Sequence, residues 1–271
     1  MAAMDKVAKV YIAIIIIVIY APILLMMLLS FNTSARPSFP MEGFTLHWFI
    51  GEIKGYEYSS YIPVIHYWQF WNALQSSIQV SVVVGMLSCI LVTATALSLR
   101  HRVVGRDIVF YLILLGFITP GVALGIGNVL MYKMFDIGTS FWSIVFIDVI
   151  FAVPFGLVLM MARFDPDLML YENAASVLKA SPVKTFRRVT LPLIQWEVLS
   201  AGILGFLLSW GELIRSMWVV RGSGVLSTFI FNQLSVNPTT TRWFAAGTIV
   251  AVISFVSLLV LGYLLTRGVK T

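Results

Sequence analysis

Residues 10–29 read VYIAIIIIVIYAPILLMMLL, a run of 20 residues without a charged side chain. A helix needs about 20 apolar residues to cross the hydrocarbon core of a bilayer. The apolar core of a signal peptide is shorter, about 7–15 residues, and is followed by a cleavage site of small residues, which this chain lacks here. We therefore predict that this stretch is a retained membrane-spanning helix.

The composition of the whole chain also indicates a membrane protein. Hydrophobic residues make up 59% of the chain and charged residues 11%, and the mean hydropathy is +0.94. A typical soluble domain has about 45–50% apolar and about 25% charged residues. A soluble globule, a disordered chain and a coiled coil are thereby excluded, and the single cysteine, Cys89, excludes a secreted disulfide scaffold. The sequence predicts an all-α integral membrane protein.

Five further segments are long and apolar enough to span a membrane, and two of them carry charges. We expect one transmembrane domain over residues 1–271, with six spans at about 10–31, 74–99, 108–132, 137–162, 194–220 and 243–266. Pro120 and Pro154 lie within two of these spans and are expected to break or kink their helices.

Lys and Arg residues are unequally divided between the two sets of connections. The side that holds the N-terminus collects 12 of the 18 and the other side 5, while Arg215 lies within a span. Because basic residues gather on the cytoplasmic side of membrane proteins, both termini are expected in the cytoplasm. The net charge of +6 is then a topology signal, and no nucleic-acid partner is expected.

The longest cytoplasmic connection, residues 163–192, carries signals for two short helices. Asp165 is a candidate N-cap with Pro166 at the first helical position, and Ser181 with Pro182 repeats this signal. Apolar residues recur at helical spacing in the first helix, namely Leu168, Tyr171, Ala175 and Leu178. The sequence predicts two helices at an angle to each other, joined rigidly to the following span.

This segment resembles the EAA loop of binding-protein-dependent ABC importer permeases. The family's pattern is Glu-Ala-Ala, three residues, Gly, nine residues and Ile-x-Leu-Pro. Ala174 and Ala175 fall on the two alanines, and Leu191 and Pro192 fall on the final Leu-Pro. The resemblance implies that the segment docks into a groove of an ATPase subunit and transmits its closure to the spans.

Two positions of the loop depart from the pattern. Asn173 stands where the family has Glu, with Glu172 one place earlier, and Lys179 stands on the glycine. Glycine tolerates a positive φ without strain and lysine does not, so the turn geometry is in question. The residues predicted to couple the chain to the ATPase are Glu172, Asn173, Ala174, Ala175, Lys179, Leu191 and Pro192.

Other short motifs extend the resemblance to one branch of the superfamily. Gly43-Phe44-Thr45 with Trp48, Ile118-Thr119-Pro120, Phe141-Trp142-Ser143-Ile144 and Ala152-Val153-Pro154-Phe155 resemble spermidine/putrescine-type permease subunits. The resemblance implies a type I ABC importer permease fold in the bacterial cytoplasmic (inner) membrane. It also implies an ATPase homodimer, a second permease subunit and an external or periplasmic solute-binding protein as partners. The implied solute is a polyamine or a similar small charged molecule.

Three charged residues lie well inside predicted spans, away from the span ends, where charges are costly and usually face the protein interior or an aqueous pathway. They are Asp148 in the fourth span and Glu212 with Arg215 in the fifth, where a spacing of three places both on one helical face. One interpretation is structural, with Glu212 and Arg215 neutralising each other and Asp148 bonding a neighbouring helix. The other is that these residues line the translocation pathway together with Trp210.

The sequence shows no motif for binding ATP or a metal, so the energy for transport is expected to come from a partner. The chain has no Gly-x-x-x-x-Gly-Lys-Ser/Thr loop, and its three histidines and one cysteine show no metal-ligand spacing. We therefore expect a non-enzymatic subunit without a metal or cofactor of its own, with ATP and Mg²⁺ on the partner ATPase. The alternative is a secondary transporter of a small charged solute that works without an ATPase.

Overall fold

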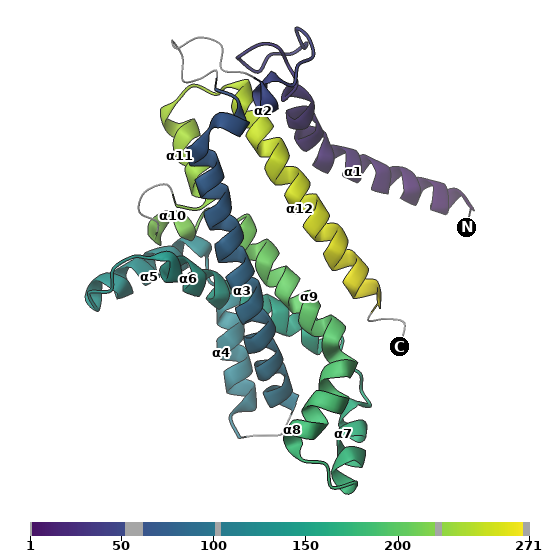
Figure 1. The fold of residues 1–271 in the computed structure, drawn as a ribbon. Helices are drawn as coiled ribbons and strands as arrows, with labels where there is room; N and C mark the ends of the chain where they lie inside the picture. The colour runs from purple at the N-terminus through teal and green to yellow at the C-terminus, as the bar shows by residue number, and fades with distance from the viewer. Residues whose placement is uncertain (1, 52–61, 101–103, 220–223, 268–271) are drawn as a thin grey trace. The chain divides into compact units, whose positions relative to one another are not determined.

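The computed structural model describes the backbone of residues 2–51, 62–100, 104–219 and 224–267 (Figure 1). Its elements over these residues are helices, with one isolated β-bridge between Asn32 and Phe44. The predicted all-helical class is confirmed for the described residues. The chain divides into two compact units, Met1–Asn72 with Ile230–Phe255 and Ala73–Phe229 with Val256–Thr271.

Among the described residues, five helices or continuous helical runs are long and apolar enough to cross a membrane, and a bent pair of helices brings the number to six if it counts as one span. The bent pair is α4 (Arg106–Ile118) with α5 (Gly121–Met134), which meet at an angle of 104°. The main helices of the other five are α1 (Ala2–Leu29), α3 (Trp68–Arg100), α6 (Phe141–Met161), α9 (Leu191–Trp210) and α12 (Thr241–Arg267).

In the first unit, two hydrogen bonds hold the segment that follows α1. The Trp48 indole, which is buried, donates from Nε1 to the carbonyl of Asn32 at 2.7 Å. The Thr241 backbone N–H at the start of α12 donates to the carbonyl of Ala35 at 2.9 Å. These bonds tie α2 (His47–Ile50) and the first turn of α12 to the chain that follows α1.

In the second unit, α3, α6 and α9 surround a shared apolar core. Its fully buried residues include Val92 of α3, Leu157 and Met160 of α6, and Ile194 and Ala201 of α9. Small residues allow the close approach: a side chain at Gly202 of α9 would collide with the Cys89 thiol, and one at Gly156 of α6 with Val92. Stripes of small residues are what membrane helices use to bring their backbones together.

The two prolines that were expected to interrupt spans behave differently. Pro120 separates α4 from α5 and lies at the 104° bend, so that predicted break is confirmed. Pro154 lies inside the continuous helix α6, so no break occurs there. Gly116 of α4 lies close to both the Pro154 ring and the Ile150 carbonyl, whose usual partner the proline removes. Packing by α4 thus covers the site at which α6 lacks a hydrogen bond.

The predicted fifth span, 194–220, has different limits in the structure. The helical run begins earlier, at α8 (Pro182–Thr185), and continues through the π turn η3 (Phe186–Thr190) into α9. It ends at Trp210 and gives way to a turn before the short helix α10 (Ser216–Val219), so residues 194–220 do not form one continuous helix. The Glu212 carboxylate accepts a hydrogen bond from the Arg215 backbone at 2.6 Å, a local bond that competes with the helical pattern. Val220 lies outside the described residues.

Candidate functional site: the α7–α8 segment and a buried charge cluster

The α7–α8 segment lies at one end of the bundle formed by α3 and α9 (Figure 1). The predicted pair of short helices is confirmed as α7 (Leu168–Val177) and α8, with Ser181 capping the Lys184 backbone and Pro182 at the first helical position. The prediction that Asp165 is the N-cap of α7 was wrong. Its carboxylate instead accepts a bond from the Asp167 backbone at 2.8 Å and stabilises the turn that precedes the helix.

Lys179 takes the left-handed conformation that ends α7, with φ at 58°. The Ala180 N–H donates to the Ala175 carbonyl at 3.1 Å and the Lys179 N–H to the Ser176 carbonyl at 2.9 Å. This pair of bonds is a Schellman motif, in which the left-handed position is most often a glycine. The turn that the loop pattern assigns to glycine is therefore formed here by a lysine.

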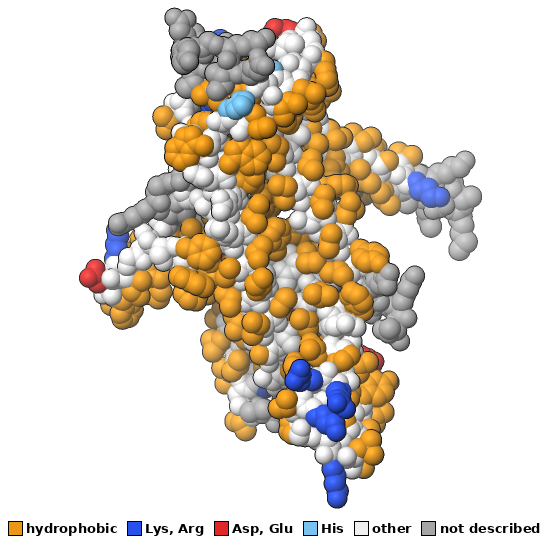
Figure 2. Space-filling view, viewed as in Figure 1, with side chains coloured by type: hydrophobic (Ala, Val, Ile, Leu, Met, Phe, Trp, Pro, Cys, Tyr) orange, Lys and Arg blue, Asp and Glu red, His pale blue; other side chains and the backbone are white. Residues whose placement is uncertain are grey.

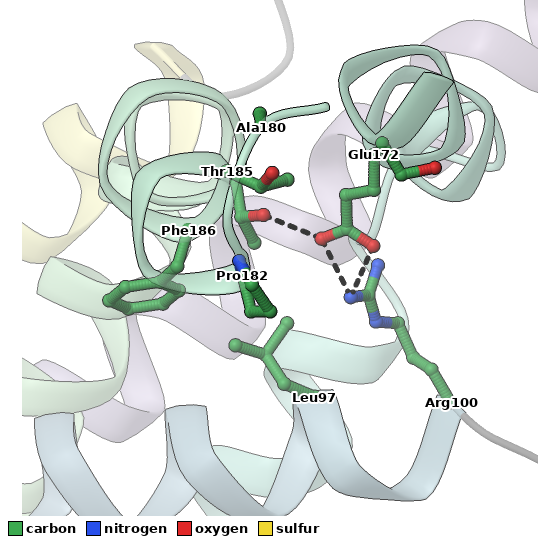
Figure 3. A pocket seen from close by; sticks show the side chains of 9 residues that line it. Leu97, Arg100, Glu172, Ala180, Pro182, Thr185 and Phe186 are labelled. Atoms are coloured by element: carbon green, nitrogen blue, oxygen red, sulfur yellow. Dashed lines mark hydrogen bonds and ion pairs between the residues drawn. The ribbon is translucent and has the colours of Figure 1, made fainter. Parts of the chain in front are cut away.

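Glu172 joins α7 to two other helices (Figure 3). One guanidinium nitrogen of Arg100, the last residue of α3, lies 3.0 Å from each carboxylate oxygen. The Thr190 hydroxyl, just before α9, donates to the same carboxylate at 2.6 Å. Figure 3 shows Glu172 and Arg100 in contact with each other at one side of a cavity that Leu97, Pro182 and Phe186 also line. The cavity has a volume of about 330 Å³. Glu172 thus faces the interior of the chain.

The opposite side of α7 presents apolar side chains to the surroundings. Asn173 and Ala174 are exposed, and so are the larger side chains Leu170, Tyr171, Val177 and Leu178. A groove of about 520 Å³ runs beside them, lined by Tyr171, Ala174, Ala175, Leu178, Arg188, Val189, Pro192 and Leu193. Figure 2 shows Lys and Arg side chains among hydrophobic ones at this end of the molecule. Exposed apolar surface of this extent commonly marks a protein–protein interaction site.

The sequence-predicted coupling residues therefore fall into two groups. Ala174, Ala175 and Pro192 line the apolar groove, whereas Glu172 contacts Arg100 and Thr190 inside the chain. Asn173 is exposed, Lys179 forms the turn after α7, and Leu191 begins α9. Sequence reasoning did not identify Arg100 and Thr190 as part of this site. Arg100 ends an apolar run and Thr190 occupies the variable position before Leu-Pro, but nothing in the spacing indicates that both meet one carboxylate.

A second cluster of charges is buried between α6 and the end of α9. The Arg215 guanidinium lies 2.5 Å from the Glu212 carboxylate and 3.8 Å from that of Asp148. The Ser209 hydroxyl donates to the other Asp148 oxygen at 2.7 Å. The Arg215 guanidinium carbon also lies 3.7 Å from the centre of the Phe151 ring.

The contacts in the cluster are those of the structural interpretation of these residues, but the reason given for one of them is corrected. Glu212 and Arg215 pair, and Asp148 bonds Ser209 on the neighbouring helix. The pair does not share a helical face, because α9 ends before it and a turn brings the two side chains together. Trp210 is buried and stacks on Phe206 at 6.0 Å. The described residues contain no group of three His, Cys, Asp or Glu side chains that could hold a metal ion.

Comparison with known proteins identifies relatives across most of the chain. The spermidine/putrescine transport system permease protein PotC of Escherichia coli K12 is 26% identical over 220 residues, or 80% of this chain and 78% of the relative. The PotC protein of Haemophilus influenzae is 27% identical over 92% of both chains. This chain is related to the spermidine/putrescine-type transport permeases. The resemblance predicted from the EAA-type loop and the shorter motifs is thereby confirmed.

A third relative has a different named solute. The putative 2-aminoethylphosphonate transport system permease protein PhnV of Salmonella typhimurium is 26% identical over 75% of this chain and 73% of the relative. No family model matches the chain.

The left-handed lysine generates a first prediction. Lys179→Gly is expected to keep or raise stability, by up to about 1 kcal/mol, because glycine removes the strain of a positive φ. Lys184→Gly is the matched control, since Lys184 lies in α8, and it should lower stability by about 1 kcal/mol. Thermal unfolding of the purified variants in one detergent measures both changes. Equal losses in the two variants would contradict the assigned turn.

The contact between Glu172 and Arg100 generates a second prediction. A double-mutant cycle with Glu172→Ala and Arg100→Ala should give a coupling free energy of about 1–3 kcal/mol, because the pair is largely shielded from solvent. The matched control is the exposed pair Arg106–Asp107, which is also separated by 3.0 Å and should give no more than about 0.5 kcal/mol. The cycle is measured by thermal unfolding. Similar coupling in both cycles would show that Glu172 and Arg100 interact no more strongly than a surface pair.

Proposed function

We propose that this chain is a permease subunit of an ATP-driven ABC importer in the cytoplasmic (inner) membrane of a bacterium. The relationship to transport-system permeases carries the proposal, and the α7–α8 segment supports it with an exposed apolar surface in the register of the family's ATPase-docking loop. In this proposal the chain is not an enzyme. ATP and Mg²⁺ bind to a separate ATPase subunit, and this chain needs no cofactor.

The proposed topology has six spans in one transmembrane domain, with a type I importer permease fold. It counts α4 and α5 as one broken span and places both termini in the cytoplasm. The unequal distribution of Lys and Arg between the connections supports this orientation, because it assigns the α7–α8 segment to the basic side. The ATPase is found on the same side of the membrane.

In the proposed coupling mechanism, the ATPase receives the apolar side of α7. Asn173, Ala174 and Ala175 contact the ATPase, and closure of the ATPase dimer displaces α7. Glu172 carries this displacement to α3 through Arg100 and to the start of α9 through Thr190. Leu191 and Pro192 begin α9 without interrupting the run that starts at Pro182, so the spans move with the segment.

The proposed assembly contains two copies of the ATPase, a second permease subunit that is either identical or similar, and an external or periplasmic binding protein that delivers the solute. The solutes in the relatives' names are spermidine, putrescine and 2-aminoethylphosphonate, which all carry an aliphatic amine. We therefore propose a polyamine or a similar small amine-bearing solute. Asp148, Trp210, Glu212 and Arg215 are the proposed pathway residues.

Co-purification tests the importer against a secondary transporter, which no observation favours. The tagged chain is purified in mild detergent from its native host, and its partners are identified by mass spectrometry. We expect an ATPase with a Walker motif and a second permease copy or homologue. A stable chain that is repeatedly recovered without any ATPase would contradict the proposal.

The docking surface generates a further prediction. Ala175→Glu is expected to abolish ATP-dependent uptake while the protein remains in the membrane, because a carboxylate in an apolar groove costs several kcal/mol, on the order of 1–5, unless it is paired. The control is Val104→Glu, which adds the same charge at a fully exposed position before α4 and should leave uptake unchanged. Uptake of radiolabelled putrescine and membrane levels are measured together. Normal uptake by Ala175→Glu would exclude this surface as the coupling site.

A further inference from the structure

The break between α4 and α5 and the end of α9 meet at Arg215. Gly121, the first residue of α5 after the 104° bend, packs against the aliphatic part of the Arg215 side chain. Arg215 itself lies in the turn between α9 and α10, where the helical run that begins at Pro182 has ended. Non-helical backbone at membrane depth is tolerated where it is buried in protein or lines an aqueous cavity, and discontinuous helices often form transport sites. The buried cluster is thus placed where a transport pathway would be expected.

The cluster contains more negative than positive groups. Asp148 and Glu212 contribute two carboxylates, and Arg215 is the one basic side chain within 4.0 Å of them among the described residues. Asp148 is only 2% exposed, and its Oδ1 atom accepts no hydrogen bond from the described residues. The closest guanidinium nitrogen is 3.8 Å from it, beyond hydrogen-bond range. A buried carboxylate oxygen without a donor is costly, so a cation that donated a hydrogen bond to Oδ1 would be favoured in place of the present partner.

The surroundings of Arg215 resemble a binding site for an organic cation. The guanidinium lies over the Phe151 ring, between one carboxylate in contact and another that is incompletely paired. An aromatic face attracts ammonium and guanidinium groups, and carboxylates hold them by charge-assisted hydrogen bonds. A divalent metal of the Ca²⁺ type would instead need six or more oxygen ligands. The described ligand set therefore suits an amine or a guanidine better than a metal.

We propose that Asp148, Glu212 and Phe151 form a binding site for an organic cation, that Arg215 occupies this site in the present structure, and that the amine of a solute replaces it during transport. Arg215 is then a tethered occupant that keeps the two carboxylates partly neutralised between transport cycles. The use of the site in transport rests on the proposed function. The existence of the site does not, and it can be tested without ATP.

The test uses Arg215→Ala in the full-length chain, purified with the subunits that accompany it. Thermal unfolding is followed with putrescine, ethylguanidinium or the neutral isostere 1,4-butanediol. At about ten times its Kd, each cation should raise the unfolding midpoint of the variant by about 3–5 °C. The diol should not raise it, and the wild-type midpoint should move much less, because Arg215 fills the site.

Two further variants keep the test decisive. Adding Glu212→Gln to Arg215→Ala should remove the shift, whereas Arg106→Ala, which breaks the exposed pair with Asp107, should behave like wild type. If Arg215→Ala does not accumulate, Arg215→Gln replaces it, since glutamine removes the charge and keeps much of the packing. No cation-specific shift in the variant that folds, or an equal shift with the diol, overturns the proposal.

Uptake of radiolabelled putrescine by the wild-type complex separates this proposal from the proposed function. A cation-specific shift without ATP-dependent uptake of any solute would support the site and contradict the importer. Uptake that depends on ATP, together with no shift in Arg215→Ala, would support the importer and contradict the site.

Discussion

The contact between Glu172 and Arg100 determines how the α7–α8 segment is attached to the rest of the chain. Helices as short as α7 and α8 have little stability of their own, and most of the large apolar side chains of α7 are exposed. Leu168 is the buried residue of α7, so the remaining attachment depends strongly on the polar contact. One carboxylate binds Arg100 at the end of α3 and Thr190 before α9. A displacement of α7 must therefore move α3 and α9, or break this contact.

The carboxylates of the two charge clusters differ in how well they are paired. Both Glu172 oxygens have a partner, and one of them has two. In the Asp148 cluster, two carboxylates share one guanidinium, and one buried oxygen accepts no hydrogen bond from the described residues. A fully paired carboxylate holds its partners rigidly in place. An incompletely paired carboxylate is better suited to exchange its partner. This difference explains why we assign coupling to the first cluster and solute binding to the second.

The second cluster lies where α4 gives way to α5 and where α9 ends. Pro120 separates α4 from α5, and a local side-chain bond of Glu212 accompanies the end of α9. Pro154 shows that a proline by itself does not break a helix. Helix α6 continues through it, and Gly116 of α4 packs against the Ile150 carbonyl that lacks its usual helical partner. Whether a span breaks depends on what its neighbours supply to the freed backbone groups. That information is absent from the local sequence.

The sequence by itself determined the all-helical apolar class, the approximate positions of most long apolar helices and the α7–α8 segment. These features depend on composition, on runs of apolar residues and on local capping signals such as Ser181-Pro182. The relationship to transport permeases also followed from short motifs. All of these are properties of residues that are near one another in the chain, so periodicity and propensity are sufficient to predict them.

Only the tertiary structure decided which residues act together. It turned Glu172 toward Arg100 and left Asn173 exposed, although the two are adjacent in the chain. It also brought Asp148 and Phe151 of one helix to Arg215 in a turn that follows another. Such contacts join residues more than 60 positions apart, and they depend on helix rotation and on where helices end. Hydrophobic periodicity predicts which face of a helix is buried, but it does not specify the partner on that face.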